Sequence, residues 1–258
     1  MRRFYIDEID RSSGALTLTG PEARHITRVL RMDSGDRIVV MDRKGSRIQA
    51  LITSVRRNEV QVLVERRLPP PPAPQVDIFL GQAILKSRAM DYVIQKTSEL
   101  GVSALYPFSS ARSVLRPDER QYAEKRRHWV EISRAATKQS DRVSPPEVGP
   151  RSSLEALLGQ WRKRRALKII LWEGEEARDL KHLLRSSTPE KALVGLVGPE
   201  GGFTREEIGI ASEAGFLSVS LGRRILRAET AAVTLVALVQ YEWGDLSLGK
   251  DTSDADER

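Results

Sequence analysis

Residues 193–207 read Leu-Val-Gly-Leu-Val-Gly-Pro-Glu-Gly-Gly-Phe-Thr-Arg-Glu-Glu, and this stretch decides the fold. The apolar run 193–197 is typical of a strand in a buried parallel sheet. Thr204, with Glu207 three residues later, forms a capping box that predicts the start of a helix. The glycines between strand and helix allow positive φ and a close approach of backbone to a ligand. Ligands of open α/β sheets lie at the carboxyl ends of strands. The stretch therefore predicts an α/β domain with a ligand loop at 198–203; a tight turn without a ligand is the alternative.

A second loop of the same kind follows the apolar run 217–221. Residues 221–230 read Leu-Gly-Arg-Arg-Ile-Leu-Arg-Ala-Glu-Thr, and the predicted last helix, 230–243, comes next. Either Glu229 or Thr230 simply caps that helix and the arginines are solvated, or the loop helps to hold a ligand. Two such loops on neighbouring strand ends favour a shared pocket. Neither loop matches the nucleotide P-loop or the G-x-G-x-x-G fingerprint, which argues against kinases, ATPases and ordinary dinucleotide-binding folds.

The chain divides at a proline-rich segment, because five of the residues 69–74 are proline. Proline has no backbone donor and a fixed φ, so the segment predicts a short stiff spacer. After the spacer, apolar and amphipathic runs alternate as in an α/β domain with a mostly parallel sheet. The predicted elements there are strands 76–80, 104–108 and 167–172 and helices 87–100 and 118–138. Before the spacer, strands at 15–19, 37–41, 47–55 and 59–64 and one helix at 21–30 predict a small barrel or sandwich.

Charge is unevenly distributed along the 258 residues, which carry 42 Lys and Arg, 35 Asp and Glu, and a net charge of +7. Residues 1–70 have 14 basic and 9 acidic side chains, and residues 86–142 have 12 and 7. Residues 143–258 have 16 basic and 18 acidic side chains. We therefore expect an anion-binding surface in the first half of the chain.

Composition excludes several other classes of site. The chain has no cysteine, which excludes disulfides, thiolate zinc sites, iron–sulfur clusters and a cysteine nucleophile. The histidines, His25, His128 and His182, are too scattered to suggest a metal site. No apolar run approaches the ~18 residues of a membrane span, and the acidic Asp7 comes before any secretory signal develops. We expect a soluble, cytoplasmic protein without a metal.

Taken together, these motifs resemble the RsmE family of 16S rRNA (uracil-N3)-methyltransferases, members of the SPOUT superfamily. The strings GPEGGFTREE and LGRRILRAETAAV resemble the two C-terminal signatures of that family. The resemblance also covers the opening Met1-Arg2-Arg3-Phe4-Tyr5, the segment 25–31 and the central blocks 81–86 and 95–102. The chain departs from the family at Lys138, which stands where a glutamate is expected, so a role for that carboxylate does not carry over.

The resemblance implies a two-domain architecture and a methyl donor. A PUA-like RNA-binding β-barrel is expected at residues 1–68, a linker at 69–75, and a SPOUT methyltransferase domain with a deep trefoil knot at 76–248. Residues 249–258 are expected to form a disordered tail. The resemblance further implies a homodimer that binds S-adenosyl-L-methionine and acts on 16S rRNA of the small ribosomal subunit, with no membrane and no metal involved.

Roles for individual residues follow from the matching motifs, from the implied reaction and from the positions of basic side chains. Arg227 is expected to stabilise charge that develops on O2 or O4 of the uracil, and Glu229 to accept the N3 proton. The expected cofactor-binding residues are Trp172, Glu173, Gly198, Pro199, Glu200, Gly201, Gly202, Leu221, Gly222, Ile225 and Leu226. The expected RNA-binding residues are Arg2, Arg3, Arg24, Arg28, Arg31, Lys86, Arg88, Arg112, Arg223 and Arg224. Among these, Arg24, Arg28 and Arg31 are spaced i, i+4 and i+7, so a helix would present them as one stripe.

Two other functions stay open. A related knotted methyltransferase, acting on another rRNA site, on tRNA or on a ribose hydroxyl, would carry similar loops. A non-catalytic ribosome-assembly factor would use the basic surfaces and no cofactor. Binding of S-adenosylmethionine separates the second alternative from an enzyme. Because the chain lacks cysteine, methylation through a covalent cysteine adduct is excluded, and direct attack by the uracil nitrogen remains.

Overall fold

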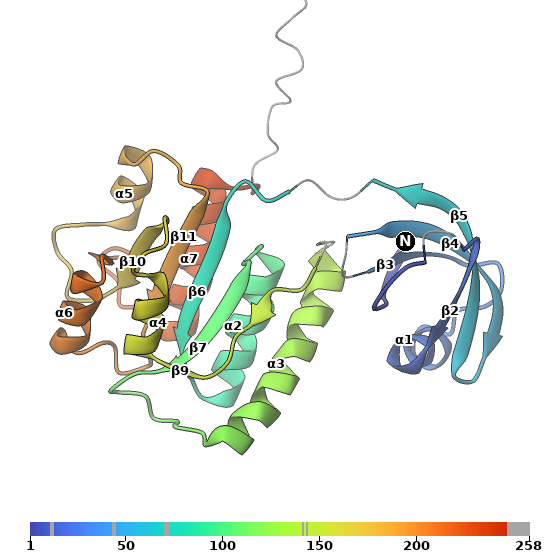
Figure 1. Ribbon diagram of the computed structural model, residues 1–258, viewed down its shortest axis with the longest axis horizontal. Helices are drawn as coiled ribbons and strands as arrows, with labels where there is room; N and C mark the ends of the chain where they lie inside the picture. Colours follow the sequence, from blue (N-terminus) through green and yellow to red (C-terminus); the bar gives the residue numbers. More distant parts are fainter. Residues whose placement is uncertain (11–12, 43–44, 70–72, 141, 143, 247–258) are drawn as a thin grey trace, which may run out of the picture. The chain divides into compact units, whose positions relative to one another are not determined.

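The computed structural model describes residues 1–10, 13–42, 45–69, 73–140, 142 and 144–246 (Figure 1). The chain forms two compact units, one made of Met1–Pro72 with Arg134–Pro145, the other of Ala73–Ser133 with Pro146–Arg258. By their contacts, residues 134–145 group with the first unit, where Lys138 forms an ion pair with Glu22, and the domain bounds expected from the sequence stay a prediction. The expected tail 249–258 and linker residues 70–72 lie outside the described residues.

The first unit is a curled five-stranded sheet with the strand order β1-β3-β4-β5-β2 (Figure 1). Its strands are β1 (Arg2–Tyr5), β2 (Ala15–Thr19), β3 (Arg37–Met41), β4 (Arg47–Arg56) and β5 (Glu59–Leu68). All neighbouring strands are antiparallel except β1 and β3, which are parallel. The sheet wraps around a core of buried side chains such as Phe4, Ile38 and Ile52. Four of these strands were predicted; β1, which pairs far along the chain, was not.

The predicted helix at 21–30 is split in two. An α-helix, α1 (Gly20–Arg24), continues as a π-helical turn, η1 (His25–Val29). Arg31 follows the turn with a φ of 49°, in the left-handed region, and so lies outside any helix. Arg24, Arg28 and Arg31 are all exposed, but the expected single helical stripe is wrong because the chain changes its winding between them.

The second unit is a parallel sheet with the order β12-β10-β11-β6-β7-β8, and β9 also pairs with β7 (Figure 1). Its strands are β6 (Asp77–Ala83), β7 (Ala104–Ser109), β8 (Glu147–Val148), β9 (Ser152–Ser153), β10 (Leu167–Leu171), β11 (Ala192–Val197) and β12 (Leu217–Val219). The five predicted strands correspond to β6, β7, β10, β11 and β12, and all their pairings are parallel. The strand order does not test the trefoil knot, which stays a prediction.

Helices cover both faces of this sheet, which explains the uninterrupted apolar runs of its strands. The helices are α2 (Ser87–Glu99), α3 (Glu119–Ser140), α4 (Leu154–Trp161), α5 (Leu180–Ser186), α6 (Arg205–Glu213) and α7 (Ala228–Trp243). In β10, Ile169 packs with the cluster of α2, α5 and α7, whereas Ile170 packs with that of α4 and α6. Sequence analysis missed α4 and α5. No helix in the described ranges has the length and apolarity of a membrane span.

Candidate active site

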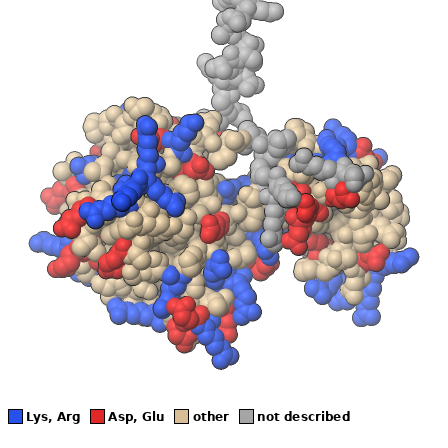
Figure 2. All heavy atoms as spheres, viewed as in Figure 1, with Lys and Arg blue, Asp and Glu red and all other residues tan. Residues whose placement is uncertain are grey.

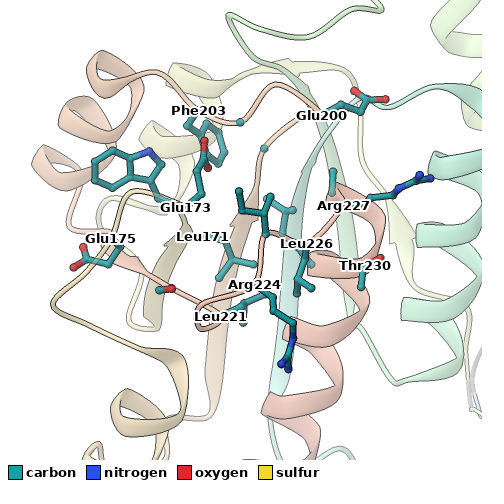
Figure 3. A pocket seen from close by; sticks show the side chains of 18 of the residues that line it. Leu171, Glu173, Glu175, Glu200, Phe203, Leu221, Arg224, Leu226, Arg227 and Thr230 are labelled. Atoms are coloured by element: carbon teal, nitrogen blue, oxygen red, sulfur yellow. The ribbon is translucent and has the colours of Figure 1, made fainter.

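A cavity of about 1530 Å³ lies at the carboxyl ends of β10, β11 and β12 (Figure 3). Three segments that leave these strands form most of its wall: 172–179, 198–203 and 220–227. The first turns of α2 and α7 complete it with Lys86, Arg88 and Glu229, among others. Because the strands are parallel and adjacent, their ends converge at one edge of the sheet, as the two glycine loops predicted.

The loop 198–203 is held in place from two neighbouring segments. The Gln82 Nε2 donates to the carbonyl of Gly198 at 3.3 Å, and the backbone N–H of Lys86 donates to Glu200 Oε1 at 3.3 Å. From the other side, Arg112 Nη1 donates to the carbonyl of Gly201 at 2.9 Å. The loop is therefore fixed by groups at the end of β6 and in the connection after β7.

Glu207 ties the same loop to the segment after β7. Its buried carboxylate accepts hydrogen bonds from the Thr204 N–H at 2.9 Å, the Ser110 hydroxyl at 2.8 Å and the Ala111 N–H at 2.8 Å. The first of these, together with the bond from the Glu207 N–H to Thr204 Oγ1, is the predicted capping box, which the structure confirms. A charged acceptor with three donors is among the stronger arrangements available to a buried carboxylate.

Gly202 is the position in this loop where the backbone conformation favours glycine. Its φ is 69°, and a Cβ at this residue would lie 2.3 Å from Glu173 Oε1. The positive φ disfavours L-side chains, and a Cβ would also displace the Glu173 carboxylate. The loop consequently passes directly against the segment that follows β10, and the two share one wall of the cavity (Figure 3).

The segment after β10 is acidic. Glu173, Glu175, Glu176 and Asp179 all line the cavity. The hydrogen bond from the Ser218 hydroxyl is the main cause that lowers the pKa of Glu175, with smaller contributions from the N–H groups of Ala177 and Arg178. Only Trp172 and Glu173 of this segment were expected from the sequence. The run of acidic residues directly after a buried strand was the signal that could have identified the others.

The loop 220–227 is basic and exposed. Ile225 is 90% exposed, and Gly222 has a φ of 103°. Helix α7 begins at Ala228 with Arg227 as its N-cap residue, and no side chain caps it. The alternative in which Glu229 or Thr230 caps this helix is therefore wrong. In Figure 3 the side chains of Arg224 and Arg227 leave the loop in different directions, Arg227 towards α2.

The cavity wall carries charges of both signs around an apolar middle. Leu171, Leu221 and Leu226 lie in this middle, with Glu173 and Glu175 on one side and Arg227 and Glu200 on the other (Figure 3). The cations that line it are Lys86, Arg88, Arg178, Arg223, Arg224 and Arg227. Such a site can hold a ligand that carries positive charge and an apolar body, next to an anionic substrate. Within the described residues, no three His, Cys, Asp or Glu side chains are grouped to hold a metal.

The structure brings most of the expected residues together. All the residues expected to bind the cofactor line the cavity, as do Arg227, Glu229, Lys86, Arg88, Arg223 and Arg224. Arg112 does not line it but holds the Gly201 carbonyl from behind. Arg2, Arg3, Arg24, Arg28 and Arg31 belong to the first unit. Sequence reasoning missed Tyr92, which does not stand out from other apolar residues of a helix, and did not single out Phe203 within the predicted ligand loop.

Comparison with known proteins defines the class of this fold and site. A family profile described as an RNA methyltransferase domain matches residues 71–240, and one described as an RNA methyltransferase PUA domain matches residues 18–65. The two matches define the class: the protein has the two domains of an RNA methyltransferase.

Relatives that match nearly the whole length of this chain identify the family within that class. The chain is 29% identical to ribosomal RNA small subunit methyltransferase E of Bacillus subtilis, covering 94% of this chain and 97% of that one. It is 32% identical to a crystal structure of ribosomal RNA small subunit methyltransferase E from Neisseria gonorrhoeae bound to S-adenosyl methionine, with 96% and 100% coverage and a TM-score of 0.86. A putative methyltransferase from Legionella pneumophila, in complex with the bound cofactor SAM, is 31% identical, with 95% and 98% coverage and a TM-score of 0.86. The chain belongs to the RsmE family.

Proposed function

We propose that the protein methylates N3 of one uridine in the 16S rRNA of the small ribosomal subunit, using S-adenosylmethionine. The observation that carries the proposal is the cavity in which two glycine-containing loops and an acidic segment meet. Support comes from relatives named ribosomal RNA small subunit methyltransferase E and from similar structures that hold S-adenosyl methionine. The uridine N3 specificity rests on the resemblance of the two loops to the family signatures.

The residues of the cavity fit S-adenosylmethionine. This cofactor is a cation at its sulfonium and ammonium groups, and Glu173, Glu175 and Asp179 put carboxylates into the wall. Leu171, Leu221 and Leu226 supply apolar surface for the adenosine. The loop 198–202 presents backbone without side chains at Gly198, Gly201 and Gly202, so a ligand can approach main-chain donors and acceptors there.

When bound, the cofactor supplies an electrophilic methyl group. The protein's part is to orient the uracil and to favour its deprotonated form, since N3 carries a proton and its lone pair belongs to the imide. Arg227, at the start of α7, would lie against the charge that develops on O2 or O4. Glu229, half-buried in the first turn of α7 and also in the cavity wall, would take the N3 proton. Positioning of the two reactants would supply much of the rate acceleration.

The RNA is held by cations of both units. In the second unit, Lys86, Arg88, Arg223 and Arg224 line the cavity and are placed to contact phosphates close to the target nucleotide. In the first unit, Arg2, Arg24, Arg28 and Arg31 are exposed and Arg3 is half-exposed. Each phosphate contact adds to the salt dependence of binding, so affinity for rRNA should fall steeply with ionic strength.

The homodimer and the cytoplasmic location belong to the same proposal. Helices α2 and α7 pack against each other and leave apolar side chains in solvent, with Tyr92 46%, Leu238 37% and Tyr241 62% exposed. Apolar surface of this kind favours an interface between copies. Light scattering on the purified protein measures the assembly directly: a dimer mass is expected, and a monomer would overturn this part of the proposal.

The test of the function is a methylation assay followed by mapping of the modified base. Small subunits and free 16S rRNA from a strain that lacks the gene are incubated with the protein and S-adenosylmethionine. Mass spectrometry is expected to find one new 3-methyluridine in one or both substrates. If the new methyl group lies on a ribose, on another base, or nowhere, the proposed specificity is wrong.

A further inference from the structure

A cluster of cations lies at the end of the sheet opposite the cavity. Helix α4 ends at Trp161, and Arg162, Lys163, Arg164 and Arg165 follow it, all four exposed, before β10 begins at Leu167. We call these four residues the basic corner. Figure 2 shows long Lys and Arg side chains gathered in the region of β10. Residues 143–258 have a net charge of −2, so the charge count of the sequence analysis did not reveal this cluster.

Neighbouring acids do little to neutralise the basic corner. Within the described part of the chain, only Arg165 of the four has an acidic partner, Glu190 at 3.5 Å, and the pair is well exposed. Exposed pairs of this kind contribute little free energy. Arg162 and Lys163 have no acidic partner among the described residues. Lys191, next to Glu190, directly precedes the neighbouring strand β11 and adds a further exposed cation.

One member of the basic corner is already oriented. The guanidinium of Arg164 lies over the Trp161 ring, 4.8 Å from its centroid. The contact restrains the side chain and leaves its N–H groups in solvent, which lowers the entropy lost when they bind an anion. The negative end of the α4 dipole also favours cations here. That effect falls off within the last turn of a helix, so it gives no reason for a run that continues three residues beyond the C-cap Arg162.

The placement identifies the kind of partner. The basic corner precedes β10, whereas the cavity follows it, and the five residues of β10 separate the two by about 15 Å. A cofactor-sized molecule in the cavity cannot reach that far. A folded polyanion whose target nucleotide enters the cavity can.

We propose that the basic corner binds backbone phosphates of rRNA, as a second contact away from the target uridine. The inference rests on the proposed function, because the polyanion is taken to be the methylated RNA. It adds a contact in the second unit that neither the family signatures nor the charge balance assigned. Such contacts fix register and orientation rather than sequence.

The test compares two triple variants that lose the same charge. R162Q/K163Q/R165Q removes three cations of the basic corner and spares Arg164 on Trp161. R120Q/K181Q/R205Q removes three exposed cations scattered over α3, α5 and α6 of the same unit. For each full-length protein, the Kd for 16S rRNA is measured between 50 and 200 mM salt, together with the Kd for S-adenosylmethionine.

The basic-corner variant is expected to bind 16S rRNA about tenfold more weakly, with a log–log salt slope smaller by about 2, since each phosphate contact contributes roughly 0.7 to 0.9. The scattered variant is expected to change both by much less, and neither should change cofactor affinity. Equal losses in the two variants would show a net-charge effect only and overturn the inference, as would no loss in either. Binding of the wild type, but not the basic-corner variant, to anionic phospholipid vesicles, with rRNA affinity intact, would also overturn it. RNA affinity is read without methylation, so failure of the proposed reaction is seen separately, in the mapping of the methylated base.

Discussion

The two loops of the cavity differ in how firmly the protein holds them. Gln82, Lys86, Arg112 and Glu207 all bond to the loop 198–203 or to the cap that follows it. In the loop 220–227, by contrast, the side chains of the three arginines make no hydrogen bond or ion pair within the described residues. The difference separates two tasks. A fixed loop loses little entropy when a small cofactor binds, whereas unengaged arginine side chains can adapt to an RNA substrate.

The largest effect on catalysis is expected from the loop 220–227. Arg227→Ala is expected to lower kcat by about 100-fold or more, because it removes the group placed against the developing charge. The affinity for S-adenosylmethionine should stay at the wild-type value. Single-turnover methylation and calorimetry measure the two quantities. Unchanged turnover would show that Arg227 is not the electrostatic catalyst.

Two glycine substitutions compare the loops directly. Gly202→Ala places a side chain at positive φ and displaces the Glu173 carboxylate in the cavity wall, so it is expected to weaken cofactor binding by more than about tenfold. Gly222→Ala also has a positive φ, of 103°, but nothing lies within 4 Å of its Cβ, so its effect on cofactor binding should be smaller. Gly209→Ala, in open space on α6, is the control and should stabilise the protein by about 0.5 to 1 kcal/mol. Equal losses at Gly202 and Gly222 would contradict the difference between the loops.

Arg112 distinguishes positioning from RNA contact. The sequence analysis placed it among the RNA-binding residues, but its guanidinium bonds to the Gly201 carbonyl. Arg112→Gln is therefore expected to raise the KM for S-adenosylmethionine about fivefold, with kcat and the salt slope of rRNA binding unchanged. Arg112→Lys, which keeps a donor, should restore part of the affinity. A smaller salt slope with normal cofactor binding would restore the original interpretation.

Glu207→Gln tests the hydrogen bonds that the Glu207 carboxylate accepts next to the loop 198–203. The amide can accept from fewer donors than the carboxylate and brings donors of its own, so a loss of about 1 to 2 kcal/mol in the free energy of unfolding is expected. Urea denaturation measures it, and Glu213→Gln, at the exposed end of α6, serves as the matched control. Equal free energies of unfolding for the two variants would show that the buried carboxylate of Glu207 contributes no more to stability than an exposed one.

The smallest expected effect is on how the stability of the protein depends on pH. The pKa of Glu175 is lowered in the folded protein, chiefly by Ser218, so its contribution to stability is present above the usual carboxyl pKa and is lost as the pH falls through the lowered value. Ser218→Ala should raise the pKa of Glu175 towards its ordinary value, as an NMR titration would show. If the pKa of Glu175 is unchanged in Ser218→Ala, the hydrogen bond from Ser218 is not what lowers it.

The sequence predicted the parts of the site that are local. The strand, the glycines and the capping box of residues 193–207 lie within one short stretch, and the structure has them in the expected order. The contacts between Glu207 and Ser110, or Arg112 and Gly201, join residues about ninety positions apart, and no periodicity or motif encodes such a pairing. The parallel pairing of β1 with β3 was missed for the same reason. The π-helical turn after Arg24 has no compositional signal either, so the arginine stripe was inferred from ideal helix geometry.

The division of tasks between the loops is tested most directly by calorimetric titration of S-adenosylmethionine into the wild type, Gly202→Ala and Arg227→Ala. The account predicts that Arg227→Ala binds the cofactor like the wild type and that Gly202→Ala binds it more than about tenfold more weakly. If Arg227→Ala loses as much affinity as Gly202→Ala, or if Gly202→Ala binds normally, the fixed loop is not the cofactor's main support and the account is contradicted.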